Sequence, residues 1–523
     1  MDALLLLMPP VLAGLIASFL FEPFLEPKPS PIRQRSLSSL LIHIGTWLLL
    51  FAVMLLLFRR PWFAVVIIGA IQLLLLLVHQ AKYFSLREAF IFQDFEYFTD
   101  AIKHPRLYLP FFGVARTIAA TIGFIGALIV GMLMETPLTE TIALPLLASL
   151  WFVMLACGLL LIRLGLKNCP PISCDPGKDL YSMGQIPFYW AYWQEEKRVR
   201  EIDLSGSPFQ NPPEPADDTK RPHIVVVQSE SFFDPRPLSN NIKPTVLTHF
   251  DRIKTESDYH GRLQVPAWGA NTVRTECAFL SGLPPDQLGI HRFNPYRLLA
   301  GQGIPTLASH LKQRGYRTVC IHPYPAGFYL RDRVFPRLGF DQFIDINSFD
   351  AQQKSGQYIG DLAVADKINE LLAAQDANQP VFIFVITMEN HGPLHLEQSN
   401  PDDHAVFYHQ APHAGCEDLT VYLRHLNNAD LMIERLKEGL LHSRLGHDNE
   451  TTPEKAREGI LCWYGDHVPI MATVYAQLGE PDGDTDYFIW KTARPDANSE
   501  AGDKTVCAHE LAALMLGIVN TLE

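Results

Sequence analysis

Five long apolar stretches near the start of the chain constrain its fold more than any other feature. The stretches contain no Lys, Arg, Asp or Glu, and they cover residues 4–21, 40–58, 62–78, 117–134 and 142–162. Each is close to the roughly 20 residues that an α-helix needs to cross a hydrocarbon core about 30 Å thick. Buried helices of a soluble protein do not account for five such runs, so we predict a transmembrane domain of about five spans over residues 1–168.

The basic residues between these stretches bear on the orientation of the spans. The connections 22–39 and 79–116 carry three and five Lys or Arg residues, whereas the connection 135–141 carries none. Basic connections favour the cytoplasmic side of a membrane. Because five spans put the two ends on opposite sides, this count by itself places the part after residue 168 in the cytoplasm.

The rest of the chain is acidic. Residues 1–168 carry 12 Lys or Arg against 9 Asp or Glu, a balance of +3, and the whole chain is −13, which leaves −16 for residues 169–523. Such a part lacks the basic surface that neutralises phosphates, so we exclude nucleic acid as a partner. Pro-rich sequence around the aromatic piece QIPFYWAYWQEEKRVREI predicts an interfacial or linker segment at 169–219, followed by a soluble domain at 220–523.

The soluble domain alternates between two kinds of pattern. Runs typical of buried strands lie at 223–228, 317–322, 381–387 and 459–465, and helical spacing lies between them at 306–316, 361–375 and 422–440. Apolar strands separated by helices predict an α/β domain with a mostly parallel sheet covered by helices on both faces.

Acidic and His side chains follow four of the predicted strands. In chain order these residues are Glu230, His322, His391 and the pair Asp466–His467. Ligands of such sheets gather outside the carboxyl ends of the strands. Each residue alone is more readily explained as part of a capped turn, but the recurrence at four strand ends favours one shared metal site. Carboxylate and imidazole ligands suit Mn²⁺, Mg²⁺ or Zn²⁺.

A nucleophile is expected in GANTVRTECAFLSGLPP, at 269–285, which predicts a loop that enters a helix. Thr272 and Thr275 lie near the start of that helix, where unpaired N–H groups attract anions. A hydroxyl beside a metal ion loses its proton more readily, and a phosphoryl group would bind at the same place. We expect Ser231 to point away from the metal and Ser281 to lie on the helix surface.

Five ordered motifs carry a resemblance to a known family. They are VVVQSESF with Glu230, NTVRTECAFL with Thr272 four residues before Glu276, CIHPYPAGFYLRDRVFPRLGFDQFID, FVITMENHGPL and WYGDH. With the five apolar stretches before them, they resemble the lipoteichoic acid synthase family, within the alkaline phosphatase/sulfatase superfamily.

The resemblance implies a site and an activity. It implies that Glu230, Thr272, Asp466 and His467 hold one divalent ion, most often Mn²⁺, and that Thr272 is the nucleophile. It implies that His322, Arg331 and His391 bind a phosphoglycerol group, with Tyr329 as an aromatic contact and His391 exchanging protons. The donor would be a membrane phospholipid such as phosphatidylglycerol, and the acceptor a glycan or a glycerophosphate polymer. The resemblance also implies a multi-pass protein of the cytoplasmic membrane with an extracytoplasmic catalytic domain, against the Lys/Arg count.

Other functions remain open from the sequence. A phosphoethanolamine transferase would use the same metal and Thr, with a different head-group pocket. A sulfatase or a related hydrolase needs a Cys or Ser in a C/S-x-P-x-R setting, which none of the eight Cys provides. A transporter or scaffold would explain five spans, although His43 is the one ionisable side chain within them, and intramembrane charges usually mark transport paths.

Overall fold

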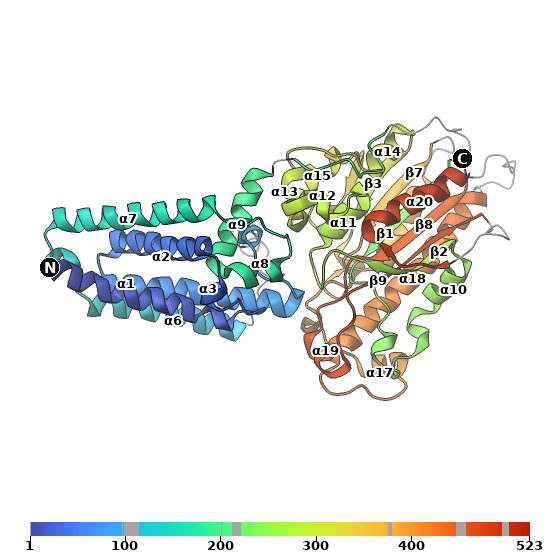
Figure 1. Ribbon diagram of the computed structural model, residues 1–523. Helices are drawn as coiled ribbons and strands as arrows, with labels where there is room; N and C mark the ends of the chain where they lie inside the picture. The colour runs from blue at the N-terminus through green and yellow to red at the C-terminus, as the bar shows by residue number, and fades with distance from the viewer. Residues whose placement is uncertain are drawn as a thin grey trace. The chain divides into compact units, whose positions relative to one another are not determined.

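The chain forms two compact units, Met1–Arg200 and Glu201–Glu523 (Figure 1). The computed structural model describes residues 2–96, 98, 114–199, 201–211, 221–374, 379–445, 457–493 and 502–522. The predicted segment 169–219 falls partly in each unit, and its last residues, together with Lys220, lie outside the described ranges. The domain limits at 168/169 and 219/220 therefore stay predictions.

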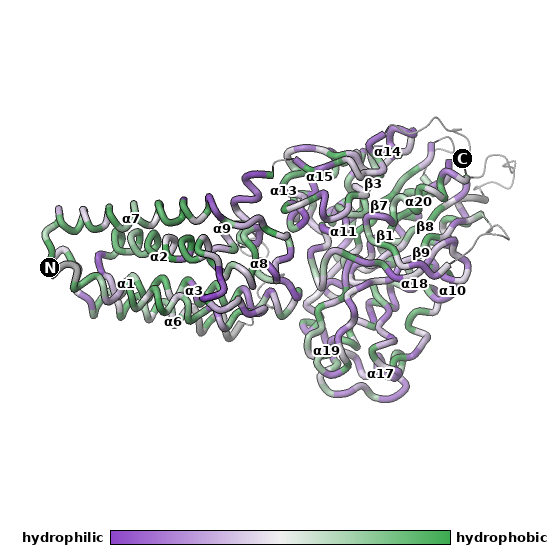
Figure 2. Tube along the Cα trace, in the orientation of Figure 1, coloured by the Kyte–Doolittle hydropathy of each residue, from purple (hydrophilic) through white to green (hydrophobic). Residues whose placement is uncertain are grey.

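The first unit is built from long apolar helices. They are α1 (Asp2–Leu20), α2 (Leu37–Phe58), α3 (Pro61–Leu86), α6 (Val114–Met134) and α7 (Leu144–Lys167). Five helices of the described residues are long and apolar enough to cross a membrane, and Figure 2 shows their predominantly hydrophobic residues. The prediction of about five spans is confirmed, and the helices are those of a multi-pass membrane protein. Pro9 and Pro10 lie inside α1 without ending it.

Small residues allow two of these helices to approach closely. A Cβ atom added at Gly45 of α2 would lie 2.8 Å from the carbonyl oxygen of Gly158 in α7, so the backbones meet there without side chains. Two shorter helices follow, α8 (Pro176–Met183) and α9 (Gln185–Arg198). The aromatic piece of the sequence forms α9, and Trp190 Nε1 donates a hydrogen bond of 2.9 Å to Thr46 Oγ1 of α2.

The second unit is organised around a mixed sheet in the order β10-β2-β9-β8-β1-β7-β3-β4, with β11 paired to β2. Five adjacent strands, from the middle of the sheet to one edge, run parallel to one another. In sheet order they are β8 (Gly459–Gly465), β1 (His223–Ser229), β7 (Val381–Ile386), β3 (Arg317–Ile321) and β4 (Gln342–Ile344). The strands beyond β8 are β9 (Thr485–Lys491), β2 (Tyr259–Gln264), β10 (Gly502–Asp503) and β11 (Val506–Cys507). Strand β9 is antiparallel to both β8 and β2, which the sequence pattern did not predict.

Helices cover both faces of this sheet (Figure 1). Val225 and Val227 of β1 pack with α10 (Thr248–Glu256), α16 (Asp361–Ala373) and α18 (Glu417–Leu445). Ile224 and Val226 pack on the other face with α11 (Thr272–Ser281), α14 (Leu307–Gln313), α15 (Arg331–Arg337) and α20 (Ala508–Leu522). This alternation is that of a strand buried on both faces, and it confirms the predicted fold class.

Short elements complete the second unit. They are α12 (Pro285–Leu288), α13 (Pro295–Leu299), α17 (Pro401–Phe407), α19 (Ala472–Leu478) and the hairpin of β5 (Lys354–Ser355) and β6 (Tyr358–Ile359).

Candidate functional site

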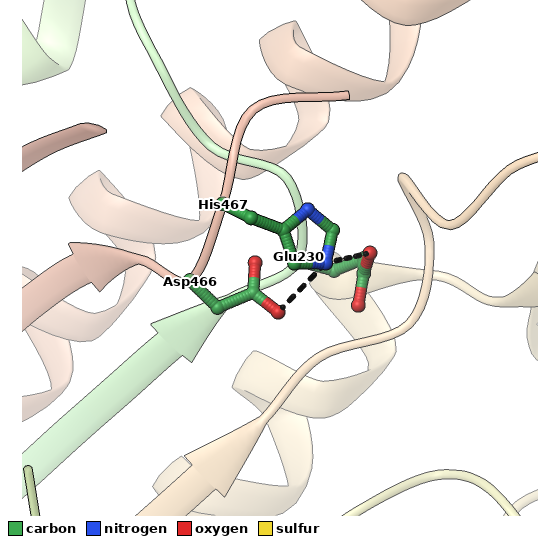
Figure 3. A group of neighbouring side chains, drawn as sticks. All are labelled: Glu230, Asp466 and His467. Atoms are coloured by element: carbon green, nitrogen blue, oxygen red, sulfur yellow. Dashed lines mark ion pairs between the residues drawn. The ribbon is translucent and has the colours of Figure 1, made fainter. Parts of the chain in front are cut away.

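Three buried side chains meet at the carboxyl edge of the sheet: Glu230, Asp466 and His467 (Figure 3). Each offers one ligand atom, and these atoms all lie within 4.8 Å of one another. His467 Nε2 is 3.3 Å from Asp466 Oδ2 and 3.5 Å from Glu230 Oε1. His467 Nδ1 lies 3.1 Å from the carbonyl oxygen of Val468, to which it donates, so Nε2 is the nitrogen left to bind a cation.

The pairing of β1 with β8 explains why these residues meet. The two strands are parallel neighbours, and Ser229 is the register partner of Gly465. The next residue of each strand, Glu230 and Asp466, therefore leaves the sheet at the same point. Glycine is required before Asp466, because a Cβ atom at Gly465 would lie 1.8 Å from the carbonyl oxygen of Phe232.

The electrostatics of this cluster suit a divalent cation. Asp466 Oδ1 accepts a hydrogen bond of 2.8 Å from the Ser231 N–H, whereas its buried Oδ2 has no hydrogen-bond partner among the described residues. Burial, followed by the neighbouring Asp466, raises the pKa of Glu230 to about 8. Two buried carboxylates and one imidazole are a donor set for Mn²⁺, Mg²⁺ or Zn²⁺, and a cation would offset their repulsion.

Thr272 is the first residue of α11 and is buried. Three residues further along the helix, Thr275 Oγ1 donates a hydrogen bond of 2.8 Å to the carbonyl oxygen of Asp466, which joins the first turn of α11 to the cluster. The hydroxyl of Thr275 is thus committed to the backbone. The Thr272 hydroxyl makes no hydrogen bond to any residue in the described ranges, while its carbonyl accepts one of 3.5 Å from Gln228 Nε2.

Two serine expectations were wrong. Ser231 does not point away: its Oγ donates to Glu230 Oε1 at 3.0 Å and lies 3.4 Å from His467 Nδ1. The left-handed backbone of Ser231, with φ of 54°, turns its side chain back toward its neighbours. Ser281 is buried rather than on the helix surface, and it donates to the Cys277 carbonyl within α11.

A second group of polar residues surrounds Arg331, which is 1% exposed. Glu276 of α11 pairs with Arg331 through both carboxylate oxygens, and Tyr296 donates to Glu276 Oε2 at 2.8 Å. Sequence reasoning noted the four-residue spacing from Thr272 to Glu276 but assigned Glu276 no role. That spacing puts the two side chains on one face of a helix, so α11 carries Thr272 and also holds the guanidinium.

His322 is buried and completes the Arg331 group. Its Nδ1 donates to the carbonyl oxygen of Ile386 at 3.1 Å, so its Nε2 accepts from Arg331 Nη1, also at 3.1 Å. Burial, with the nearby guanidinium, holds the pKa of His322 well below its usual value, and the ring is neutral. Tyr329, half-buried, has its ring 5.3 Å from the Arg331 guanidinium carbon. Tyr329 and Leu330 both have positive φ, at 54° and 58°, a conformation that marks functional loops when non-glycine residues adopt it.

His391 follows β7 and is half-buried. Its Nδ1 donates to the Gly392 carbonyl at 2.6 Å, which leaves Nε2 as the basic nitrogen. Burial lowers the pKa of His391, while Asp466 acts in the opposite direction, so the ring lies within electrostatic range of Asp466 in the candidate metal centre. The preceding Asn390 is 3% exposed, and neither polar atom of its side chain has a hydrogen-bond partner among the described residues. Sequence reasoning did not single out Asn390.

An acidic and imidazole cluster at the carboxyl edge of a doubly covered, mostly parallel sheet defines an α/β enzyme with a candidate metal centre. The Sulfatase family model matches residues 222–518 of the 523-residue chain, more than half of it. The chain belongs to the sulfatase family, whose transferases and hydrolases bind a divalent metal.

Two relatives show how far the similarity extends. The chain is 32% identical over 283 residues to the capsular polysaccharide biosynthesis protein RkpI of Rhizobium meliloti (strain 1021), a match that covers 53% of this chain and 46% of RkpI. It is 24% identical over 102 residues to lipoteichoic acid synthase 1 of Bacillus subtilis (strain 168), which covers 19% of this chain and 15% of the synthase. The chain thus spans about half the length, or less, of these relatives. The resemblance to the lipoteichoic acid synthase family is confirmed by the family match and this second relative.

One solved structure shares the layout of both units. The integral membrane protein lipooligosaccharide phosphoethanolamine transferase A (EptA) from Neisseria meningitidis is similar with a TM-score of 0.53 at 13% identity. The match covers 92% of this chain and 87% of EptA. At that identity the similarity establishes the fold: apolar helices followed by a sulfatase-like domain.

Proposed function

We propose that the chain transfers a phosphoglycerol group from a membrane phospholipid to an acceptor hydroxyl through a covalent intermediate on Thr272. The observation that carries the proposal is the hydrogen bond from Thr275 to the Asp466 carbonyl. It joins the first turn of α11, which begins with Thr272, to the cluster of Glu230, Asp466 and His467. The Thr272 hydroxyl has no hydrogen-bond partner within the described ranges and begins a helix near a candidate cation site, which is the arrangement that a phosphoryl-transfer nucleophile needs.

The first half-reaction forms a bond between Thr272 Oγ1 and phosphorus, and breaks the bond between phosphorus and the diacylglycerol oxygen. The proton that Thr272 loses ends on the diacylglycerol oxygen. In the second half-reaction the acceptor oxygen attacks phosphorus, the Thr272–phosphorus bond breaks, and the proton of the acceptor returns to Thr272. A divalent ion held by Glu230, Thr272, Asp466 and His467 would offset charge on the phosphoryl oxygens and make a neighbouring hydroxyl more acidic.

We assign the proton transfers to His391. Its lowered pKa leaves the ring neutral at pH 7, and Nε2 is the nitrogen able to accept a proton because Nδ1 donates to Gly392. Asn390 is buried beside it, and its amide has no hydrogen-bond partner among the residues that the structure describes, so it offers one donor group and one acceptor to the hydroxyls of a glycerol head group.

Arg331, His322 and Tyr329 form the proposed phosphoglycerol pocket. The guanidinium is held in a fork by Glu276 and supplies a fixed positive charge, which suits a phosphodiester. Its remaining Nη1 group donates to His322 Nε2. A phosphate oxygen can take over that contact.

The membrane unit suggests a lipid donor, because five apolar helices would hold the catalytic unit near the bilayer. The sequence relatives support a cell-envelope acceptor: one is named as a capsular polysaccharide biosynthesis protein and another as a lipoteichoic acid synthase. We propose a glycan or glycerophosphate polymer as acceptor, Mn²⁺ as the metal, and an extracytoplasmic catalytic unit on the cytoplasmic membrane.

Trapping the intermediate tests the proposal. The full chain, reconstituted with Mn²⁺ and phosphatidylglycerol but no acceptor, is quenched and digested, and the peptides are analysed by mass spectrometry. We expect a phosphoglycerol adduct on Thr272. Thr272→Ala should show no adduct and a turnover lowered by at least about 10³-fold, since the covalent route is lost.

Matched variants give the controls. Ser231→Ala and Thr275→Val remove the two neighbouring hydroxyls, and in both the adduct should still form on Thr272. It should form more slowly in Thr275→Val, because that variant loses the hydrogen bond to the Asp466 carbonyl. Label on Ser231 or Thr275, or full turnover by Thr272→Ala, would refute the assignment. The same experiment with phosphatidylethanolamine decides the head group, because an adduct formed from that lipid alone would identify a phosphoethanolamine transferase.

A further inference from the structure

A buried cluster of one imidazole and two carboxylates lies beside the loop that carries His391. His425 of α18 is 1% exposed. Its Nδ1 is 2.9 Å from Glu389 Oε1 and its Nε2 is 3.0 Å from Glu397 Oε2. Ionised carboxylates only accept hydrogen bonds, so both ring nitrogens donate, and His425 is an imidazolium. Burial opposes this charge, but the hydrogen bonds that His425 donates to the two carboxylates outweigh it and raise the pKa of His425 to about 9.

The two carboxylates lie on either side of His391 in the sequence. Glu389 precedes His391 by two residues and Glu397 follows it by six. A single side chain from α18 therefore closes the loop 389–397 at both ends. His391 has its own ring fixed to this loop by the hydrogen bond to Gly392, so the direction of Nε2 follows the loop backbone.

Glu389 is also tied to two helices. Its Oε2 accepts from the N–H of Asp361, the first residue of α16, at 2.6 Å, and its Oε1 accepts from Asn428 of α18. Glu397 accepts from Arg424 of α18 at 3.3 Å. A buried cluster of charges rarely stabilises a fold better than apolar side chains would. Its best-attested use is to select one arrangement among several, which here would be the arrangement of the His391 loop.

We propose that His425 is a positioning residue, which holds the loop 389–397 through Glu389 and Glu397 and thereby sets the direction of His391 Nε2 in the transfer reaction. The proposal rests on the proposed function, because His391 acts on the substrate only within that function. Neither His425 nor either carboxylate belongs to the candidate metal centre.

The test uses the full chain in phosphatidylglycerol vesicles and three variants, His425→Gln, Glu389→Gln and Glu397→Gln. Glu397→Gln is included because Glu397 is the least buried member, so that variant is the safest to fold. Lys491→Met is the matched control: Lys491 pairs with Asp258 at 2.9 Å, is about as buried as Glu397, and lies beside the start of β8, at the opposite end of that strand from Asp466. Donor KM, kcat, the pH profile of kcat and Mn²⁺ affinity are measured for each.

A misplaced His391 has a signature that partial unfolding lacks. Loss of folded protein lowers kcat but leaves KM, and the pH profile of the remaining enzyme, unchanged. We expect the three cluster variants to raise donor KM about 5-fold or more, to lower kcat about 10-fold, and to shift the pH profile, with unchanged Mn²⁺ affinity. In a His391→Ala background, His425→Gln should lower kcat by less than a further factor of about 2, because both substitutions act through His391.

Hydrogen exchange separates failure of this proposal from failure of the proposed function. Exchange of the peptide spanning 387–397 needs no lipid, and it should accelerate at least about 10-fold in His425→Gln but not in Lys491→Met. Unchanged exchange and wild-type kinetics in the cluster variants would overturn the positioning role, even if Thr272→Ala is inactive. Accelerated exchange in a protein that transfers no phospholipid head group would instead overturn the proposed function.

Discussion

Three histidines of the candidate site share one hydrogen-bonding pattern. His322, His391 and His467 each donate from Nδ1 to a backbone carbonyl oxygen, those of Ile386, Gly392 and Val468. In each ring the basic nitrogen is therefore Nε2, which is free to meet a cation, a guanidinium or a proton. Backbone carbonyls fix the tautomer more rigidly than side chains do, because they belong to the ends of strands and their loops.

Replacing Arg331 by Lys should damage activity although the charge is kept. The guanidinium contacts both oxygens of Glu276 and also His322, and an ammonium group cannot reproduce that fork. We expect kcat/KM to fall about 10- to 100-fold, since bidentate recognition is worth roughly twice a single contact. Arg317→Lys is the control. Arg317 begins β3, at the opposite end of that strand from His322, and it donates a hydrogen bond to Gln342 of β4. Equal kcat/KM in wild type and Arg331→Lys would reduce Arg331 to a structural partner of Glu276.

At the level of residues, the sequence predicted that Glu230, Asp466 and His467 lie together, but not the residues that surround them. Glu230, Asp466 and His467 each follow an apolar strand, and neighbouring parallel strands bring such positions together. Glu276, Asn390 and His425 lie on helices or within a loop, where no periodicity marks a role. The pairs His425–Glu397 and Arg331–Glu276 are 28 and 55 residues apart in sequence, so only the fold reveals them.

Helix α11 serves the candidate site at two positions along its length. Thr272 begins the helix, and Glu276, one turn later, holds Arg331. Displacing this helix would therefore move the proposed nucleophile and the proposed phosphate ligand together. The hydrogen bond from Thr275 to Asp466 ties the same turn to the candidate metal centre.

The buried cluster of His425, Glu389 and Glu397 makes the stability of the fold depend on pH. The pKa of His425 is raised to about 9 from its ordinary value of 6.5. Its contribution to the free energy of unfolding is therefore complete below pH 6.5 and is lost as the pH rises through 9. The groups facing it are Glu389, Glu397 and Asp361, with Arg424 paired to Glu397. We expect the difference in unfolding temperature between wild type and His425→Gln to shrink from pH 7 to pH 10, as measured by calorimetry in detergent. A difference that stays constant over this range would mean that His425 is neutral in the folded protein.

At the level of elements, the apolar patterns predicted the strands at the centre of the sheet and missed those at its side. Strands β1, β7 and β8 are buried along their whole length, so they appear as continuous apolar runs. Strand β2, YHGRLQ, is largely half-buried and polar, and β4 has only three residues. Short or half-exposed strands are specified by their pairing partners, which a local pattern does not contain.

The orientation of the whole molecule in a membrane can be tested directly. The Lys/Arg count favours a cytoplasmic second unit, whereas the proposed function requires an extracytoplasmic one. We expect alkaline phosphatase fused after Lys220 to be active and green fluorescent protein fused there to be dark, since each reporter works on one side only. Fusions within the short connection 135–141 should give the reverse result. A fluorescent fusion after Lys220 would show that the second unit is cytoplasmic, as the Lys/Arg count favours.

The central position of β8 has a consequence for the synthesis of the protein. Strand β1 is made first, but β8, its neighbour in the sheet on the β9 side, comes 236 residues later in the chain. Until the ribosome has produced β8, one edge of the apolar strand β1 has no partner, and exposed edges of this kind promote aggregation. Such long-range pairing also slows folding. The chain is therefore most in need of chaperones between the synthesis of residues 229 and 459, and the candidate metal centre is complete only after that interval, when Asp466 and His467 have been made.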